Sequence, residues 1–259
     1  MSAEAVFVPQ DGRFIATELA RGPWDSNAQH GGAPAALLMR EFERLPLGED
    51  LLIGRVTYEF LRPVPLAPLA VRSSIVRPGR RVQLLEASVF AGEDTEVVRA
   101  RALRIRHAEM DGLSEPLAPP LGPAEGRESD LIAPHRPMFA PDAIEIRFVE
   151  GAFMAPGPST AWYRLRVPLI AGEEPSPLQS LAAAGDFGNG VSAVVSWDDH
   201  VFINPDLTLY IDRAPQGEWV CLQAETRVVS DGIGMAESVL FDERGRVGRA
   251  TQALVVARR

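Results

Sequence analysis

The feature that most constrains the fold of this chain is an internal repeat at an offset of about 151 residues. Residues 56–62 (VTYEFLR) are echoed by residues 207–213 (LTLYIDR), and apolar side chains occupy alternate positions in both segments. The echo continues along the chain, where Glu86 falls opposite Glu237. A repeat of this length indicates that a whole structural unit was duplicated, rather than an array of short repeats.

The first unit is predicted to contain one helix followed by four strands. A strand-like stretch near residues 14–19 precedes a helix over residues 32–44, where Leu38 and Phe42 belong to a set of apolar residues at helical spacing. Turn-forming Pro, Gly and Asp residues separate the segments that follow. The four predicted strands cover residues 54–62, 68–77, 81–91 and 95–106.

The second unit repeats this order of elements. Strands are predicted near residues 143–148 and 161–167, and a helix over 177–187. Residues 191–202 are ambiguous and fit a loop with room for a short strand. Four further strands are predicted near residues 206–213, 218–230, 233–242 and 246–257. The fold class is therefore α+β, with two antiparallel sheets that each carry a packed helix.

A connector separates the two units. Between residues 115 and 141 the periodicity disappears and seven prolines occur, which predicts an extended segment without a core of its own. We therefore expect an N-terminal domain at residues 1–110, a Pro-rich connector at 111–142 and a C-terminal domain at 143–259.

The composition argues against several classes of function. A net charge of −9 is unsuited to a general nucleic-acid binder, because a surface that follows phosphates needs a basic excess. All 26 basic residues are arginine, so no lysine can form a Schiff base. The single cysteine, Cys221, is predicted to be a core residue, and Asp198-Asp199-His200 lacks a further metal ligand at suitable spacing. With no apolar run of 18 residues, we expect a cytoplasmic protein without a metal or a membrane partner.

Asp186 conflicts with its predicted local structure. It falls in the last turn of the second predicted helix, just before the stop signal Gly188-Asn189-Gly190. A carboxylate there faces the negative end of the helix dipole, at a cost of a few tenths to about 1 kcal/mol. Either function requires this carboxylate, or it points into water beside a flexible turn.

Gln252 presents a second conflict. On the last predicted strand it shares the apolar face with Ala250 and Leu254, and a buried amide needs hydrogen-bond partners. The matching position in the first unit is Ala102, so only the second unit keeps the amide. Gln252 is either part of a site or a core glutamine satisfied by neighbouring backbone.

The motif His30-Gly31-Gly32 stands directly before the first predicted helix. Glycines let a ligand approach the unpaired N–H groups of the first turn, and these donors suit a developing negative oxygen. The same motif also fits a junction that only needs a flexible backbone, with His30 bonded to the loop. Asn204, before Pro205, is by itself only a turn signal.

These motifs together resemble the double hotdog acyl-CoA thioesterases, specifically the bacterial acyl-CoA thioesterase II family and its thioesterase-like relatives. The resemblance runs from His30-Gly31-Gly32 to Gln252 and is clearest in residues 144–150, 161–164 and 181–187. It implies a tandem hotdog fold, in which two antiparallel sheets each wrap a central helix, in agreement with the duplication.

The resemblance also implies a catalytic set of Asp186, Gln252 and Asn204. The family has Thr or Ser at the position of Asn204, so the chain departs from the pattern there. The implied reaction is hydrolysis of an acyl-CoA thioester by water, without a covalent intermediate, a metal or a cofactor. Asp186 would orient the water and accept its proton, while Asn204 and Gln252 would hold the water.

The substrate is expected to contact the first helix. The N–H of Gly32, with Gly31 and His30 beside it, would receive the oxyanion. The acyl chain would lie in an apolar passage between helix and sheet. The residues expected to line that passage are Leu38, Phe42 and Phe60.

Two other functions remain open at this point. A non-catalytic acyl-CoA binding protein is favoured by the departure at Asn204. An enoyl-CoA hydratase on the same fold needs a histidine after an Asn-Pro pair, and none follows Asn204-Pro205-Asp206 closely. The resemblance further implies a homodimer that acts in fatty acid metabolism on acyl-CoA, with no nucleic-acid partner.

Overall fold

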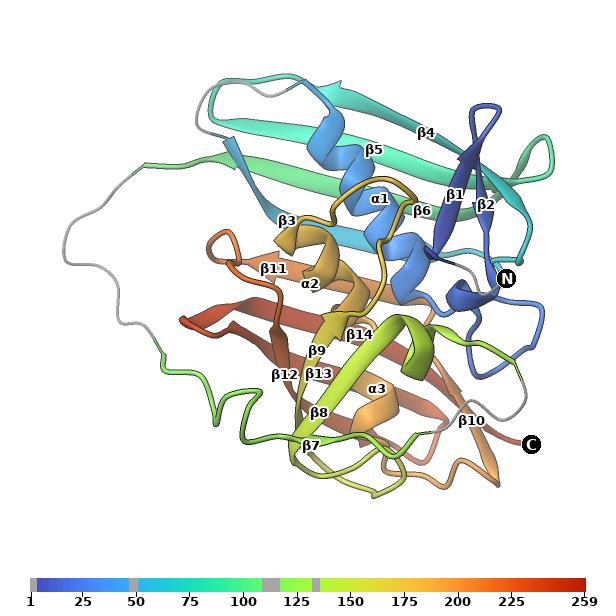
Figure 1. Cartoon of the computed structure of the whole chain (residues 1–259), viewed down its shortest axis with the longest axis vertical. Helices are drawn as coiled ribbons and strands as arrows, with labels where there is room; N and C mark the ends of the chain where they lie inside the picture. Colours follow the sequence, from blue (N-terminus) through green and yellow to red (C-terminus); the bar gives the residue numbers. More distant parts are fainter. Residues whose placement is uncertain (1–3, 47–50, 109–116, 132–135) are drawn as a thin grey trace.

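The two copies of the repeated segment lie side by side in the centre of the sheet (Figure 1). In the computed structural model they form β3 (Leu51–Phe60) and β11 (Asp206–Ile211), which pair antiparallel with Thr57 opposite Thr208. These two threonines are 151 residues apart in sequence, and their hydroxyls lie 3.1 Å apart. Each copy therefore pairs with its own equivalent, and the duplication produces an approximate twofold arrangement at this junction.

The structure describes residues 4–46, 51–108, 117–131 and 136–259. In the first half of the chain, the elements besides β3 are β1 (Phe7–Gln10), β2 (Arg13–Ala16), the 3-10 helix η1 (Glu18–Ala20), α1 (Gly32–Arg44), β4 (Pro68–Arg77), β5 (Val82–Ala91) and β6 (Thr95–Arg106).

The second half repeats the order of one helix followed by strands. Besides β11, its elements are β7 (Arg127–Glu128), the π-helix η2 (Phe139–Ala143), β8 (Ile144–Glu150), β9 (Ser159–Leu165), α2 (Pro177–Gly185), α3 (Gly188–Val191), β10 (His200–Ile203), β12 (Val220–Val228), β13 (Ile233–Asp242) and β14 (Gly245–Arg258).

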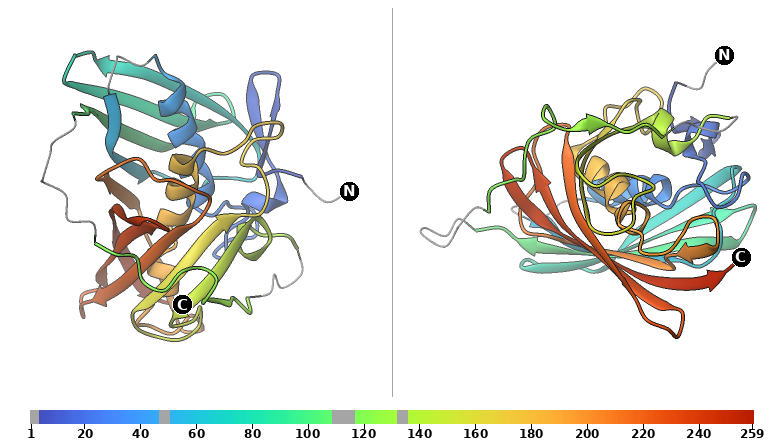
Figure 2. Two further views of the ribbon diagram at one scale, coloured as in Figure 1. Left: turned by 60° about the vertical axis from the view of Figure 1, so that its left-hand side comes forward. Right: turned by 90° about the horizontal axis from the view of Figure 1, so that it is seen from below.

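The two expected sheets are joined into one continuous sheet. Among the described residues it has 14 strands, 13 of them in the order β1-β2-β4-β5-β6-β3-β11-β14-β13-β12-β9-β8-β7, with β10 paired to β14. The joint is the β3–β11 pair, which satisfies backbone groups that would otherwise form two open edges. Figure 2 shows how the sheet curves around the helices.

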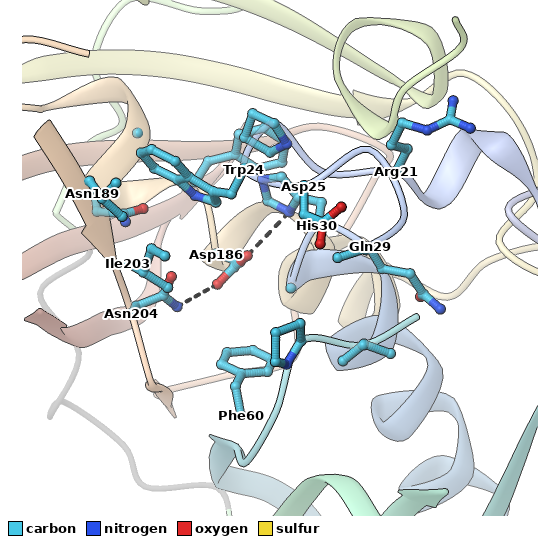
Figure 3. A pocket seen from close by; sticks show the side chains of 18 of the residues that line it. Arg21, Trp24, Asp25, Gln29, His30, Phe60, Asp186, Asn189, Ile203 and Asn204 are labelled. Atoms are coloured by element: carbon cyan, nitrogen blue, oxygen red, sulfur yellow. Dashed lines mark hydrogen bonds and ion pairs between the residues drawn. The ribbon is translucent and has the colours of Figure 1, made fainter. Parts of the chain in front are cut away.

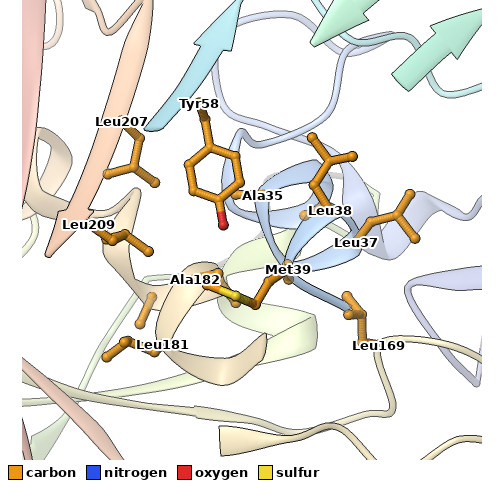
Figure 4. Packing of buried hydrophobic residues seen from close by; sticks show 14 of the residues in the cluster. Ala35, Leu37, Leu38, Met39, Tyr58, Leu169, Leu181, Ala182, Leu207 and Leu209 are labelled. Atoms are coloured by element: carbon orange, nitrogen blue, oxygen red, sulfur yellow. The ribbon is translucent and has the colours of Figure 1, made fainter. Parts of the chain in front are cut away.

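The helix over residues 32–44 is confirmed as α1. It packs beside α2 inside the curved sheet, and at Gly32 the two helices are so close that a Cβ atom would collide with the carbonyl oxygen of Ala183. Figure 4 shows Tyr58 of β3 between Leu207 of β11 and Ala35 of α1. This apolar cluster is the main core of the molecule.

The second helix differs from the prediction, because it ends before Asp186 and the glycines that follow lie in a further short helix. α2 ends at Gly185, and the chain passes through Asp186, in the right-handed helical region (φ −82°, ψ −3°), into the short helix α3. Glycine is permissive and can adopt helical angles as readily as a terminating turn. Gly188 has a packing role instead, since a Cβ there would lie 2.9 Å from Oε1 of Gln252.

The other boundary differences are local. The strand expected near residues 14–19 ends earlier as β2, because Thr17 caps η1 by accepting a hydrogen bond from the N–H of Leu19. The ambiguous region before residue 202 contains the short strand β10. Cys221 lies in the core beside Trp162 and Phe241, as predicted.

The described parts of the predicted connector pack on the C-terminal half. Trp162 donates its indole N–H to the carbonyl of Leu121 at 2.7 Å, and the connector contributes β7 and η2. The predicted boundary at residues 110 and 111 lies outside the described residues, so the division into domains stays a prediction. Within the described ranges, no helix combines the length and apolar character needed to cross a membrane.

Candidate active site

A pocket of about 840 Å³ lies where the start of α1 meets the end of α2 (Figure 3). Its wall includes five of the residues expected from the sequence: His30, Gly31, Phe60, Asp186 and Asn204. These residues come from both halves of the chain. The site is therefore assembled across the junction between the two repeats.

Asp186 is the centre of the polar contacts in this pocket. Its carboxylate oxygen Oδ1 accepts hydrogen bonds from Asn204 Nδ2 at 2.7 Å and from Gln252 Nε2 at 3.2 Å. The other oxygen, Oδ2, lies 3.1 Å from His30 Nδ1. Although Asp186 is only 5% exposed, its charge is met by donors, and such charge-assisted hydrogen bonds are worth about 1.5–3 kcal/mol each. They offset the unfavourable position at the helix end.

Gln252 holds Asp186 and does not reach the pocket. It lies on the inner face of β14, where its Nε2 also contacts the backbone oxygen of Asp186 at 3.3 Å. Its Oε1 accepts the backbone N–H of Asn189 at 3.1 Å. Both ends of the amide are engaged and the side chain is not part of the pocket wall. Gln252 therefore fixes the turn between α2 and α3, and its expected contact with a water molecule stays a prediction.

Asn204 is positioned by a break in a strand. β10 and β11 both pair with the same edge of β14, and the chain leaves that edge between Ile203 and Asp206. The carboxylate of Asp206 fills the gap by accepting the N–H of Ala253 at 2.7 Å, and burial raises the pKa of this carboxyl. Asn204 Nδ2 also donates to the carbonyl of Asp206 at 3.0 Å. The break thus aims the amide of Asn204 at Asp186.

The N–H of Gly32 faces His30 rather than the pocket. Its amide donates to Nδ1 of His30 at 3.0 Å, and Gly32 is not part of the pocket wall. Gly31 does line the pocket, and its N–H has no acceptor among the residues that the structure describes. Gly31 therefore offers a backbone donor to a ligand at the start of α1, while the expected oxyanion contact stays a prediction.

His30 stands between two partners that compete for one nitrogen. Its Nδ1 lies 3.0 Å from the N–H of Gly32 and 3.1 Å from Oδ2 of Asp186. A single ring nitrogen can accept from the first or donate to the second, but not both at once. The ring is held by stacking on Phe187, with centroids 4.3 Å apart. Movement of one proton therefore decides which contact His30 makes.

The expected acyl passage along α1 is filled. Leu38 and Phe42 are fully buried in the core and do not line the pocket, because close packing of helix on sheet leaves no channel there. The apolar wall comes instead from residues that the sequence did not single out. Among them, Trp24 and Trp197 stack with ring centroids 4.8 Å apart. Trp24 and Trp197 are far apart in the sequence, and no local pattern predicts that they come into contact.

Within the described part of the chain, no three His, Cys, Asp or Glu side chains cluster in a way that could hold a metal ion. The polar groups gathered around Asp186 in the pocket wall are its own buried carboxylate, the amide of Asn204, the imidazole of His30 and the backbone N–H of Gly31. Such a set can orient a water molecule and stabilise a developing negative oxygen.

Family comparison agrees with this chemistry. Residues 20–105 match the acyl-CoA thioesterase N-terminal domain, and residues 116–256 match the acyl-CoA thioesterase C-terminal domain. The chain belongs to the acyl-CoA thioesterase family. An acyl-CoA thioesterase hydrolyses the thioester bond of acyl-CoA, and the pocket around Asp186 is the candidate active site for this reaction. No curated protein sequence matches the chain significantly.

Solved structures show that this thioesterase has a hotdog fold. A protein assigned as a thioesterase II from Thermobifida fusca is 20% identical, with 99% of this chain and 97% of that chain covered and a TM-score of 0.72. A hot dog fold protein from Alicyclobacillus acidocaldarius is 19% identical, with the same coverage and TM-score. The acyl-CoA thioesterase II TesB2 from Mycobacterium marinum is 14% identical, with 93% and 96% covered and a TM-score of 0.66.

Proposed function

We propose that this thioesterase hydrolyses acyl-CoA with a water molecule that Asp186 orients and deprotonates. The observation that carries the proposal is the asymmetric environment of the buried carboxylate. Oδ1 is occupied by two amide donors, whereas Oδ2 faces His30 and lies against Gly31 at the pocket wall. Oδ2 is therefore the oxygen placed to bind a water molecule.

The reaction follows from this geometry. The water oxygen attacks the thioester carbonyl carbon while its proton passes to Oδ2 of Asp186. The carbonyl oxygen becomes negative and accepts the N–H of Gly31, supported by the positive end of the α1 dipole. The C–S bond then breaks, and CoA leaves as a thiolate that takes the proton back from Asp186. A thiol with a pKa near 8.5 is a good leaving group and needs little further help.

Asn204 and His30 complete the proposed water site. The side-chain oxygen of Asn204 receives no hydrogen bond within the described residues, so it is free to accept the second hydrogen of the water. His30 Nδ1 lies within reach of Oδ2, the oxygen that gains the proton, and can share it. In this proposal Asn204 takes the role that Thr or Ser has in the family pattern.

The finer description of the fold belongs to the same proposal. A double hotdog is supported by the packing of α1 on β4, β5 and β6, and of α2 on β9, β11 and β12. Each half then wraps one helix, with the site at the junction. A homodimer, a cytoplasmic location and a role in fatty acid metabolism stay predictions from the family resemblance.

The decisive experiment compares thiol release by the native protein and by Asp186→Asn, which keeps the size of the side chain. A panel of short, medium, long and aromatic acyl-CoAs serves as substrate, and acyl-CoA binding is measured by calorimetry. We expect the variant to bind acyl-CoA and to release no thiol. Native protein that binds but releases no thiol from any substrate would instead be a binding protein. Hydration of an enoyl-CoA without thiol release would identify a hydratase.

A further inference from the structure

The pocket reaches both faces of the sheet. Along β14, Gln252 and Leu254 point to the helix side, so Val255 and Ala257 point to the outer side. Val255 and Ala257 nevertheless line the same pocket as Asp186. A cavity with walls from both faces passes through the sheet rather than ending against it.

The opening lies where β3 stops. Its last residue, Phe60, donates its N–H to the carbonyl of Pro205 at 2.8 Å. β10 continues along β14 beyond this point, with Ile203 opposite Val255, but within the described residues no strand covers its other edge. The loop after β3 and the edge of β10 therefore frame a gap in the sheet.

The loop that borders this gap carries Arg62, an exposed arginine whose side chain forms no hydrogen bond with the described residues. Arg62 lines the pocket and is exposed, and it forms no ion pair with any described carboxylate. The other arginine of the wall, Arg21, donates to the carbonyls of Ser26 and Pro137 and pairs with Glu18. Arg62 is thus the pocket arginine available to bind an anion.

The inner end of the pocket is apolar and contains space. Phe153 and Gly190 lie there, inside the curve of the sheet and near Trp197. A Cβ atom on Gly190 would lie 3.8 Å from Trp197 and 4.0 Å from Phe153, so the missing side chain leaves room between the two aromatic rings. This end suits a hydrocarbon group and offers little to a charged one.

We propose that the thioester substrate passes through the sheet, with the CoA phosphates outside at Arg62 and the acyl group inside against Gly190 and Phe153. The inference rests on the proposed function, because Asp186 lies between the two ends. Phosphate oxygens form strong charge-assisted bonds with a guanidinium, and at the exposed Arg62 they stay in contact with water. The acyl group gains from leaving water at the inner end.

The outer end is tested with Arg62→Ala and two thioesters of the same acyl group, acyl-CoA and S-acyl-pantetheine, which has no phosphate. We expect KM for acyl-CoA to rise about five- to tenfold, and KM for acyl-pantetheine to stay unchanged. Arg62→Lys should recover part of the loss. Arg80→Ala, an exposed arginine far from the pocket, serves as the matched control. An equal effect on both thioesters, or on neither, overturns the assignment of Arg62.

The inner end is tested with Gly190→Leu and the smaller change Gly190→Ala on a chain-length panel. We expect both variants to prefer shorter acyl groups than the native protein, with the larger shift for leucine, and to keep the ratio of acyl-CoA to acyl-pantetheine KM. If the Gly190 variants change that KM ratio but not the preferred acyl chain length, the CoA end and not the acyl end of the substrate lies at Gly190. This test can be distinguished from a test of the proposed function. Binding of acyl-CoA and acyl-pantetheine to Asp186→Asn variants reports the orientation of the substrate even if no thioester is hydrolysed.

Discussion

At the scale of single residues, the site is a carboxylate held by amides. Asp186 and Gln252 are both misplaced by local rules, one at the negative end of a helix and one on an apolar strand face, and each satisfies the other. The two conflicts in the sequence therefore share one explanation. A residue that is unfavourable at its own position in a helix or strand points to a site when a second such residue lies within hydrogen-bond distance of it.

Gln252→Ala should reduce kcat with little change in KM. The variant removes one donor from Asp186 Oδ1 and leaves the N–H of Asn189 without its acceptor, whereas the pocket wall is unchanged. Loss of a hydrogen bond to a charged group costs about 1.5–3 kcal/mol, or about ten- to a hundredfold in rate. Steady-state kinetics with acyl-CoA measure the effect. Thr251→Ala, on the outer face of the same strand, should leave kcat unaltered, and an equal loss there would contradict a positioning role.

At the scale of elements, the close approach of α1 and α2 sets the site. Gly31 and Gly32 are adjacent but face different neighbours, Asp186 for the first and the carbonyl of Ala183 for the second. Glycine is therefore needed at both positions because neighbouring groups leave no space for a Cβ atom. An unusual backbone conformation is not the reason at Gly31, which has ordinary helical angles (φ −59°, ψ −25°).

Gly31→Ala and Gly32→Ala should separate activity from stability. A Cβ on Gly31 would lie 2.7 Å from Oδ2 of Asp186 and occupy the proposed water site, so kcat should fall about a hundredfold or more with little change in Tm. A Cβ on Gly32 would push the helices apart, at a cost of about 1–3 kcal/mol of unfolding free energy. Kinetics and thermal unfolding of both variants check the contrast. A Gly31 variant with native kcat would exclude a water at Oδ2.

A buried ion pair ties the end of β11 to the β13–β14 hairpin. Asp242 is fully buried and accepts from Arg213 at 2.6 and 2.5 Å, and from the N–H groups of Gln216 and Arg244 at 2.9 Å each. Burial opposes ionisation of Asp242, but the bonds from Arg213 and the two amides outweigh it and lower the pKa. The carboxylate therefore holds several loop segments in place.

Asp242→Asn should lower the free energy of unfolding by about 3–5 kcal/mol at pH 7, because Arg213 loses its charged partner. Since the folded pKa is depressed, the stabilisation is fully present above the unfolded value of about 3.9 and is lost as pH falls through the folded pKa. The difference between native and variant should therefore shrink below about pH 4. Denaturant unfolding at several pH values measures the difference in unfolding free energy between the native protein and the variant. A difference that does not change with pH would contradict the ion pair as the source of the stabilisation.

At the scale of the whole molecule, one sheet and one main core unite the two repeats. The β3–β11 pair continues the backbone ladder from one half to the other, and the apolar cluster includes residues of both. The candidate active site lies at this junction. The duplication thus supplied the scaffold, while only one of the two equivalent positions kept the amide of Gln252.

The protein should unfold in a single transition, because neither half buries its junction strand or its helix alone. Circular dichroism follows both halves, and tryptophan fluorescence follows mainly the second. The two denaturant curves should coincide. Thr208→Pro, which interrupts the central ladder, should destabilise the whole chain by about 3 kcal/mol or more. Thr208→Val is the control that keeps the backbone bonds. Two separate transitions in the native protein would show that the halves fold independently.

Much of the architecture was accessible from periodicity. The helix at residues 32–44 and the strands of both units follow from alternation and turn residues, which are local properties. The continuation of α2 into α3 was not accessible, because Gly188 fits a stop signal equally well until its contact with Gln252 is known. The apolar wall of the pocket was not accessible either, since Trp24 and Trp197 are brought together only by the fold.

The sequence by itself determined the duplication, the order of elements and the two polar residues that local rules reject, Asp186 and Gln252. These are properties of short segments and of their recurrence. Only the tertiary structure decided that the two repeats share one sheet, that Leu38 belongs to the core, and that the free N–H is on Gly31. The physical reason is that hydrogen bonds and close packing are completed by partners distant in sequence, and a local pattern specifies the need for a partner but not its identity.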